Sequence, residues 1–198
     1  MADRSRLAWG ITRSLSIYYR PGRRGRMDRL YSRFVRPGDL VFDIGAHVGD
    51  RIGAFSRLGC QVIAVEPQPP LVALLRRFYG RSAGVRIEPV AIAAAPGTIE
   101  LLVNSANPTL TTASPAFVAA AGNAKGWGNE RWEHRLRVPA VTLDQLIERY
   151  GQPSFLKLDV EGFEAEALAG LSRRLQALSF EFTTIERGNA SRCLARCC

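Results

Sequence analysis

The chain has few of the features that would place it in or across a membrane. Among its 198 residues, no apolar run approaches the roughly 18–20 residues that a membrane-spanning helix requires. The N-terminus also lacks the apolar core of a secretory signal peptide. We therefore expect a cytoplasmic protein without a transmembrane segment.

The four cysteines fit neither a metal site nor a disulfide framework. Cys193, Cys197 and Cys198 crowd the C-terminus without a paired histidine, and Cys60 stands alone. Zinc sites and disulfide-rich domains need regularly spaced ligands, which this arrangement lacks. A reduced protein with no bound metal is the simplest interpretation.

Lysine is almost absent, because only Lys125 and Lys157 are lysines among the 27 basic residues. The net charge of +9 is unevenly placed: residues 1–36 hold ten arginines and two aspartates, a net of +8, which leaves +1 for residues 37–198. We expect residues 1–36 to form a basic helical segment, in the simplest case a solvated helix pair. A peripheral contact with an anionic membrane surface, a nucleic acid or an anionic substrate is the alternative.

The alternation of apolar runs and turn residues predicts an α/β fold with an open, mostly parallel sheet and helices on both faces. Residues 37–198 are expected to form one domain, with an insert or lid at about 97–141. Within the insert, strands 98–103 and 134–141 pair, and residues 104–133 form a functional loop. The expected main strands are 40–44, 61–65, 85–90, 155–160 and 179–185; the expected helices are 6–20, 27–35, 50–58, 69–79, 142–150 and 162–177.

The first informative motif joins two strand ends that each finish in an acid. Asp43 precedes Gly45 and Gly49, and Glu66 follows 23 positions after Asp43 (66 minus 43), about the length of one strand–helix–strand unit. Glycines let the backbone approach a nucleoside cofactor, and the second acid accepts its ribose hydroxyls. The Asp43 carboxylate would repel a pyrophosphate, so an NAD-dependent oxidoreductase is disfavoured. The carboxylate suits a cofactor with a cationic end, such as S-adenosylmethionine.

The second motif surrounds Lys157, which lies inside an apolar run. The period of a strand puts Lys157 and Asp159 on one face. A buried lysine needs a carboxylate beside it, and Asp159, Glu161 and Glu181 are available. Such a cluster at a strand end can bind and deprotonate a hydroxyl. A metal-assisted reaction is an alternative that Asp159, Glu161 and Glu164 could together support, because Glu161 and Glu164 can share a helix face.

Four motifs in order resemble the FkbM family of S-adenosylmethionine-dependent methyltransferases. They are Asp43-Ile44-Gly45-Ala46-His47-Val48-Gly49, Val65-Glu66-Pro67, Val138–Asp144, and the run from Lys157 to Glu164. The resemblance covers roughly residues 38–185. It implies a class I, Rossmann-like methyltransferase fold and O-methylation of a hydroxyl on a sugar, polyketide or similar small metabolite.

The resemblance also implies roles for individual residues. Asp43, Gly45 and Gly49 would cradle the methionine part of the cofactor, and Glu66 would hold the ribose. His47, in the same turn, is expected to bind the cofactor as well. Val90 and Ala91 would lie beside the adenine. Lys157, Asp159 and Glu161 would lie near the transferred methyl group, with Asp159 or Glu161 as the base and Lys157 either orienting that carboxylate or binding the acceptor oxygen. The loop would close over the site, with Trp127 or Trp132 stacking on a substrate ring or anchoring the loop.

The sequence departs from the family pattern in two places. His47 stands where the family usually has Asn, which introduces a titratable group beside a cation. The chain also ends 13 residues after Ile185 (198 minus 185), so we expect the final strand hairpin of the class I sheet to be missing and strand 179–185 to be an exposed edge. An inactive, truncated cofactor-binding remnant is therefore one alternative. A nucleic-acid methyltransferase is another, although no RNA-binding module or base-flipping motif is recognisable.

Overall fold

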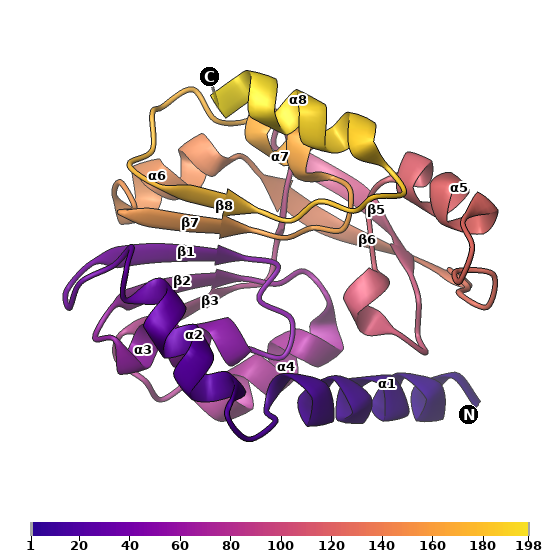
Figure 1. Ribbon diagram of the computed structural model, residues 1–198, viewed down its shortest axis with the longest axis horizontal. Coiled ribbons are helices and arrows are strands. Elements are labelled where there is room, and N and C mark those ends of the chain that lie inside the picture. Colours follow the sequence, from indigo (N-terminus) through magenta and orange to yellow (C-terminus); the bar gives the residue numbers. More distant parts are fainter. Residues whose placement is uncertain (1, 198) are drawn as a thin grey trace.

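A five-stranded parallel sheet forms the centre of the structure, a computed structural model that describes residues 2–197 and the side chains of residues 5–197 (Figure 1). The strand order is β3-β2-β1-β7-β8, and every neighbouring pair is parallel. The strands are β1 (Leu40–Ile44), β2 (Gln61–Val65), β3 (Val85–Glu88), β7 (Phe155–Leu158) and β8 (Leu178–Phe180). The predicted α/β class with a mostly parallel sheet is confirmed.

The alternation of side chains along β1 divides the core into two layers. Val41 faces one layer, which is covered by α2 (Arg23–Tyr31), α3 (Asp50–Arg57) and α4 (Pro69–Tyr79). Phe42 and Ile44 face the other, which is covered by α6 (Leu143–Tyr150), α7 (Glu164–Ala169) and α8 (Arg187–Cys197). The helices therefore cover both faces, as predicted.

The order of the strands determines where a ligand can bind. Successive strands run outward from β1 through β2 to β3, and the chain later returns to the other side of β1 with β7 and β8. Adjacent loops then leave in opposite directions and open a crevice at the carboxyl ends of β1 and β7. In Figure 1 the arrowheads of β1, β7 and β8 all point to the same side, toward β5 and β6.

A second, three-stranded sheet lies beyond these strand ends, in the order β4-β6-β5. β5 (Gly97–Val103) and β6 (His134–Val141) are antiparallel, as expected, and β4 (Ala91–Ile92) pairs in parallel with β6. The predicted strand 85–90 is wrong at its end, because β3 stops at Glu88 and β4 joins the second sheet. Between β5 and β6, the chain forms the 3-10 helix η1 (Pro108–Leu110) and helix α5 (Pro115–Asn123).

Three further predictions are wrong in their extent. Helix 162–177 is only α7, which ends before Gly170, whose backbone packs against the Ala93 carbonyl: a Cβ on Gly170 would lie 2.5 Å from that oxygen. Strand 155–160 ends at Leu158, and strand 179–185 is only β8. β8 is the edge of the sheet, and no strand follows it within residues 2–197.

The predicted N-terminal helices are shifted toward the N-terminus, as α1 (Ala2–Tyr18) and α2. Cys60 and Cys193 are buried thiols, and Cys198 lies outside the described residues. Every helix within residues 2–197 is too short or too polar to span a lipid bilayer.

Candidate active site

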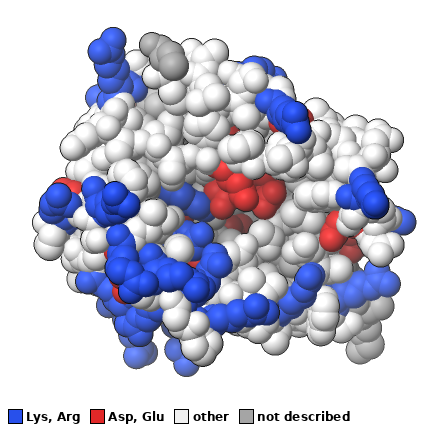
Figure 2. Space-filling model, viewed as in Figure 1, with Lys and Arg blue, Asp and Glu red and all other residues white. Residues whose placement is uncertain are grey.

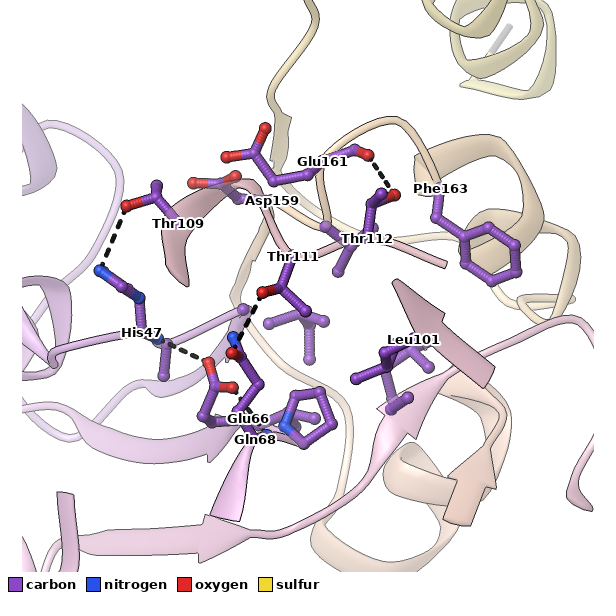
Figure 3. Close-up of a pocket in the computed structure, with 18 of the residues that line it drawn as sticks. His47, Glu66, Gln68, Leu101, Thr109, Thr111, Thr112, Asp159, Glu161 and Phe163 are labelled. Atoms are coloured by element: carbon purple, nitrogen blue, oxygen red, sulfur yellow. Dashed lines mark hydrogen bonds between the residues drawn. The ribbon is translucent and has the colours of Figure 1, made fainter. Parts of the chain in front are cut away.

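A cleft of about 840 Å³, open mouth included, lies at the carboxyl ends of β1, β2 and β7. One wall comes from these strand ends, a second from β4, β5 and the segment around η1, and a third from Tyr18 at the end of α1. Figure 3 shows polar side chains from the strand ends and η1 on one side of the cleft and Leu101 and Phe163 on another.

Glu66 is a buried acid at the end of β2, with 3% of its surface exposed. Its carboxylate accepts the backbone N–H of His47 at 3.0 Å and that of Gln68 at 2.9 Å. Burial raises the pKa of Glu66 to about 7, and the two backbone hydrogen bonds oppose this rise. Each oxygen keeps a second lone pair, so the carboxylate can still accept a ligand hydroxyl.

His47 has left-handed backbone, with φ +48°, and its ring lies between α1 and η1. The Tyr18 ring meets it edge-on at 5.6 Å between centroids, and Nε2 lies 3.4 Å from the Thr109 hydroxyl. Burial, aided by the positive charge of Lys157, lowers the pKa of His47 to about 4. The imidazole is therefore neutral at physiological pH and adds no second cation to the site.

Lys157 is 8% exposed and uses its ammonium group to tie two strand ends together. Nζ lies 3.0 Å from the Asp159 carboxylate, 3.0 Å from the Gly45 carbonyl and 3.6 Å from the Asp43 carboxylate. Burial alone would lower the pKa of Lys157, but Asp159 and Asp43 outweigh it and the pKa is raised. Because an ammonium has three donors, these partners leave little capacity to bind an acceptor oxygen.

Asp159, Glu161 and Glu181 form an acidic cluster in which one carboxylate oxygen from each lies within 4.8 Å of the others. Burial would raise the pKa of Asp159, but Lys157 outweighs it and the pKa is lowered. The hydrogen bond to Asp159, followed by burial, raises the pKa of Glu181 to about 8. Burial and the neighbouring acids raise the pKa of Glu161. Asp159 is therefore the member of the cluster that is held in its ionised form, whereas the pKa values of Glu161 and Glu181 are both raised.

Glu164 does not join this cluster. Its side chain turns inward, where it accepts the backbone N–H groups of Val160 and Gly162 at 2.9 and 3.0 Å and the Asn189 amide at 2.6 Å. Glu164 is therefore not beside Asp159 and Glu161, as the metal-assisted alternative expected; the third acid of the cluster is Glu181. Glu164 instead fixes the loop that presents the acidic cluster.

The structure brings most of the predicted site residues to the cleft wall. Those that line it are Gly45, His47, Glu66, Val90, Ala91, Lys157, Asp159 and Glu161. Asp43 lies fully buried behind Lys157, and neither of its oxygens has a hydrogen-bond partner among the described residues. Gly49 is enclosed by Leu75 and Tyr79. These two positions shape the site from behind.

Gly45 shows why the first turn needs glycine. Its φ is +75°, and a Cβ at this position would lie 1.8 Å from the Asp159 carbonyl oxygen. The close approach of two backbone segments therefore brings the ends of β1 and β7 together, and Asp159 reaches the cleft as a result.

Sequence reasoning missed several residues of the cleft. Thr111 donates to the Gln68 side-chain carbonyl at 3.1 Å, and the Gln68 amide donates to the Pro108 carbonyl at 3.3 Å. These bonds connect η1 to the end of β2, but the contacts are distant in sequence and leave no local signal. Tyr18 was recognisable only as part of an apolar helix face.

The two loop tryptophans are anchors of the insert. Trp127 and Trp132 pack edge-on against buried Phe117, with centroids 5.7 and 6.1 Å apart. The Trp132 indole also donates to the Leu110 carbonyl at 2.7 Å. Neither ring lines the cleft, so the predicted stacking on a substrate ring is not what this arrangement supports.

Comparison with known families agrees with this geometry. The family model of the methyltransferase FkbM domain matches residues 43–191. The chain belongs to the FkbM methyltransferase family. The match includes the acidic cluster and begins after α1 and α2, so the FkbM model leaves the N-terminal helices uncovered.

A curated relative of this chain is the hexuronic acid methyltransferase AglP of Haloferax volcanii. It is 27% identical over 172 residues, which are 83% of this chain and 64% of the relative. The chain thus spans somewhat less than two thirds of the relative's length.

Proposed function

We propose that the protein transfers the methyl group of S-adenosylmethionine to a hydroxyl of a sugar. The observation that carries this proposal is the presence of two carboxylates in one cleft, one on each side of β1 in the sheet. Buried Glu66 lies at the end of β2, and ionised Asp159 follows β7, fixed by Lys157 at 3.0 Å. One acid suits a ribose and the other suits a reacting hydroxyl.

The cleft lining fits this cofactor. Glu66 retains lone pairs for the ribose hydroxyls, and Val90, Ala91 and Phe163 offer an apolar surface for the adenine. S-adenosylmethionine, when bound, supplies a methyl group activated by a positively charged sulfur. The ionised Asp159 carboxylate favours such a cation nearby.

On the acceptor side, Asp159 holds the hydroxyl and takes its proton. The Lys157 ammonium keeps Asp159 ionised and fixes its orientation, so Lys157 is a positioning residue. A correctly placed base and acceptor contribute through alignment as well as proton transfer. The raised pKa values of Glu161 and Glu181 favour their neutral forms, which limits the charge repulsion that three ionised carboxylates would create.

The acceptor class is inferred from the relative named as a hexuronic acid methyltransferase. Its name supports a sugar in preference to a nucleic acid or a polyketide. The match covers only 64% of that relative, so the relative's activity cannot simply be assigned to this chain. The proposed activity therefore needs a direct test on the chain itself.

The first test is calorimetric titration of the chain with S-adenosylhomocysteine. We expect Glu66→Gln to weaken binding at least tenfold, because the buried carboxylate loses an acceptor for the ribose. Glu148→Gln, an exposed acid on α6, is the matched control and should bind as the wild type does. Absence of binding by the folded wild-type protein would refute the cofactor assignment.

The second test separates binding from chemistry. Asp159→Asn should bind S-adenosylhomocysteine within about threefold of the wild type. With radiolabelled S-adenosylmethionine, its methyl transfer to sugar acceptors should fall by about 100-fold or more, the usual contribution of a positioned base. Full activity of Asp159→Asn would contradict the assigned role.

A further inference from the structure

A second hollow adjoins the mouth of the cleft and is strongly basic. Its lining residues are Tyr18, Tyr19, Arg20, Arg23, Arg24, Met27, Asp50 and Arg57. Four arginines and one aspartate give this arginine hollow a formal charge of +3. Tyr18 and Asp50 also line the cleft, so the two spaces are adjacent.

Much of this positive charge has no protein partner. In the part of the chain that the structure describes, the Arg20 and Arg24 guanidinium groups have no acidic group within 4.0 Å. Arg23 Nε is 3.6 Å from Asp50, and this buried atom lacks a hydrogen-bond partner among the described residues. Arg57 is held by Asp28 at 2.6 Å. A buried donor without a partner, here Arg23 Nε, can take an acceptor group that a ligand supplies.

Tyr18 lies between the arginine hollow and the acidic cluster. The Arg23 guanidinium stacks over its ring at 4.9 Å, and the ring meets His47 on the cleft side. Burial raises the pKa of Tyr18, and Asp159 is the next largest contributor. Figure 2 shows the corresponding contrast: acidic side chains gather in a central hollow, and basic side chains border it on the lower left.

We propose that the arginine hollow binds an anionic group, a carboxylate or a phosphate, of the sugar whose hydroxyl is methylated at Asp159. The inference rests on the proposed function. The ionised Asp159 carboxylate disfavours an anion beside it, so an anionic acceptor enters the site in one orientation, with its hydroxyl at Asp159 and its charged group at the arginines. Planar guanidinium groups match the oxygens of carboxylates and phosphates. Because the hollow is built mainly from residues before residue 43, it lies largely outside the family match and gives this chain its own acceptor preference.

Paired probes test the charge alone. p-Nitrophenyl β-D-glucuronide and p-nitrophenyl β-D-glucoside differ only at carbon 6, and glucose 6-phosphate and glucose form a second pair. Each is titrated by calorimetry into the full chain, with and without S-adenosylhomocysteine. We expect at least one anionic probe to bind tenfold or more tightly than its neutral counterpart, and the pair that shows the preference identifies carboxylate or phosphate. The preference should weaken as NaCl rises from about 0.05 to 0.5 M.

Variants locate the site. Arg20→Gln/Arg24→Gln removes two exposed charges without removing any ion pair, and should reduce the preference to threefold or less. Arg76→Gln/Arg77→Gln, two exposed arginines of α4 that do not line the hollow, is the matched control and should keep the preference. Equal binding of anionic and neutral probes, or a preference that survives the first double variant, would overturn the inference. Failure to bind S-adenosylhomocysteine with the anion preference intact would instead refute the proposed cofactor site.

Discussion

His47 is expected to make the protein less stable in mild acid. Burial, followed by the charge of Lys157, lowers its pKa from 6.5 to about 4 in the folded state. Between these two values the unfolded chain binds a proton that the folded protein does not. Above pH 6.5 the imidazole is neutral in both states, and its titration does not lower the free energy of unfolding. As the pH falls from 6.5 toward 4, the unfolded chain is favoured and stability is lost.

The two pKa values set the size of the effect. At pH 5, proton binding favours the unfolded chain by a factor of (1 + 10^1.5)/(1 + 10^−1), about 30, which corresponds to about 2 kcal/mol. At pH 7.5 the same expression is close to one. Glu66 has the opposite effect on the free energy of unfolding, because its pKa is raised to about 7 in the folded state. The stability that its protonation adds is fully present below pH 4.5 and is lost as the pH rises through 7. The pH profile of the wild type alone thus mixes two effects.

The His47→Asn variant isolates the histidine. Glu66 accepts the backbone N–H of residue 47, which the variant keeps, and asparagine tolerates the left-handed backbone at φ +48°. Urea unfolding at pH 7.5 and pH 5.0 gives the free energy of unfolding for both proteins. We expect the wild type to lose about 2 kcal/mol more than His47→Asn between these pH values. Equal losses, within about 0.5 kcal/mol, would refute a buried neutral imidazole.

Three substitutions test the architecture by urea unfolding and S-adenosylhomocysteine titration. Gly45→Ala should lower the free energy of unfolding by more than about 3 kcal/mol, since the added Cβ meets the Asp159 carbonyl. Gly126→Ala, at φ +91° in open space, is the control and should lower it by about 1 kcal/mol. Similar losses for the two variants would contradict the close packing at Gly45. Glu164→Gln should lose about 2 kcal/mol and weaken ligand binding, because one carboxylate oxygen becomes a donor facing a donor. Lys157→Met should lose about 3–5 kcal/mol by leaving buried carboxylates without their cation, and a neutral result would refute the buried ion pair.

The parts of the fold that follow from local pattern were predictable from the sequence. The bounds of β1 and β2 agree with the prediction because each is an apolar run between turn residues. The predicted helix 162–177 failed for a non-local reason: Gly170 ends α7 where its backbone packs against Ala93, 77 positions away (170 minus 93). No periodicity in the helix itself carries that information.

In the candidate site, the features that follow from composition or from a local motif were likewise predictable. A buried lysine requires an anion, and this requirement left Asp159, Glu161 and Glu181 as candidate partners of Lys157, of which the structure selects Asp159. The excess of arginine before residue 37 was equally visible. The sequence did not show that Tyr18 would place these arginines beside the cleft, because this depends on how α1 packs on the strand ends and η1.

The charges of the site divide into a part that holds the fold and a part available for chemistry. Asp43 is fully buried without a hydrogen bond among the described residues, and its compensation comes from Lys157 at 3.6 Å. The same ammonium keeps Asp159 ionised, so removing Lys157 damages stability and the proposed base together. Asp159 is partly exposed, and its replacement by asparagine removes one charge while Asp43 keeps its cation. For this reason Asp159→Asn can distinguish a catalytic carboxylate from a structural ion pair, and a variant at Lys157 cannot.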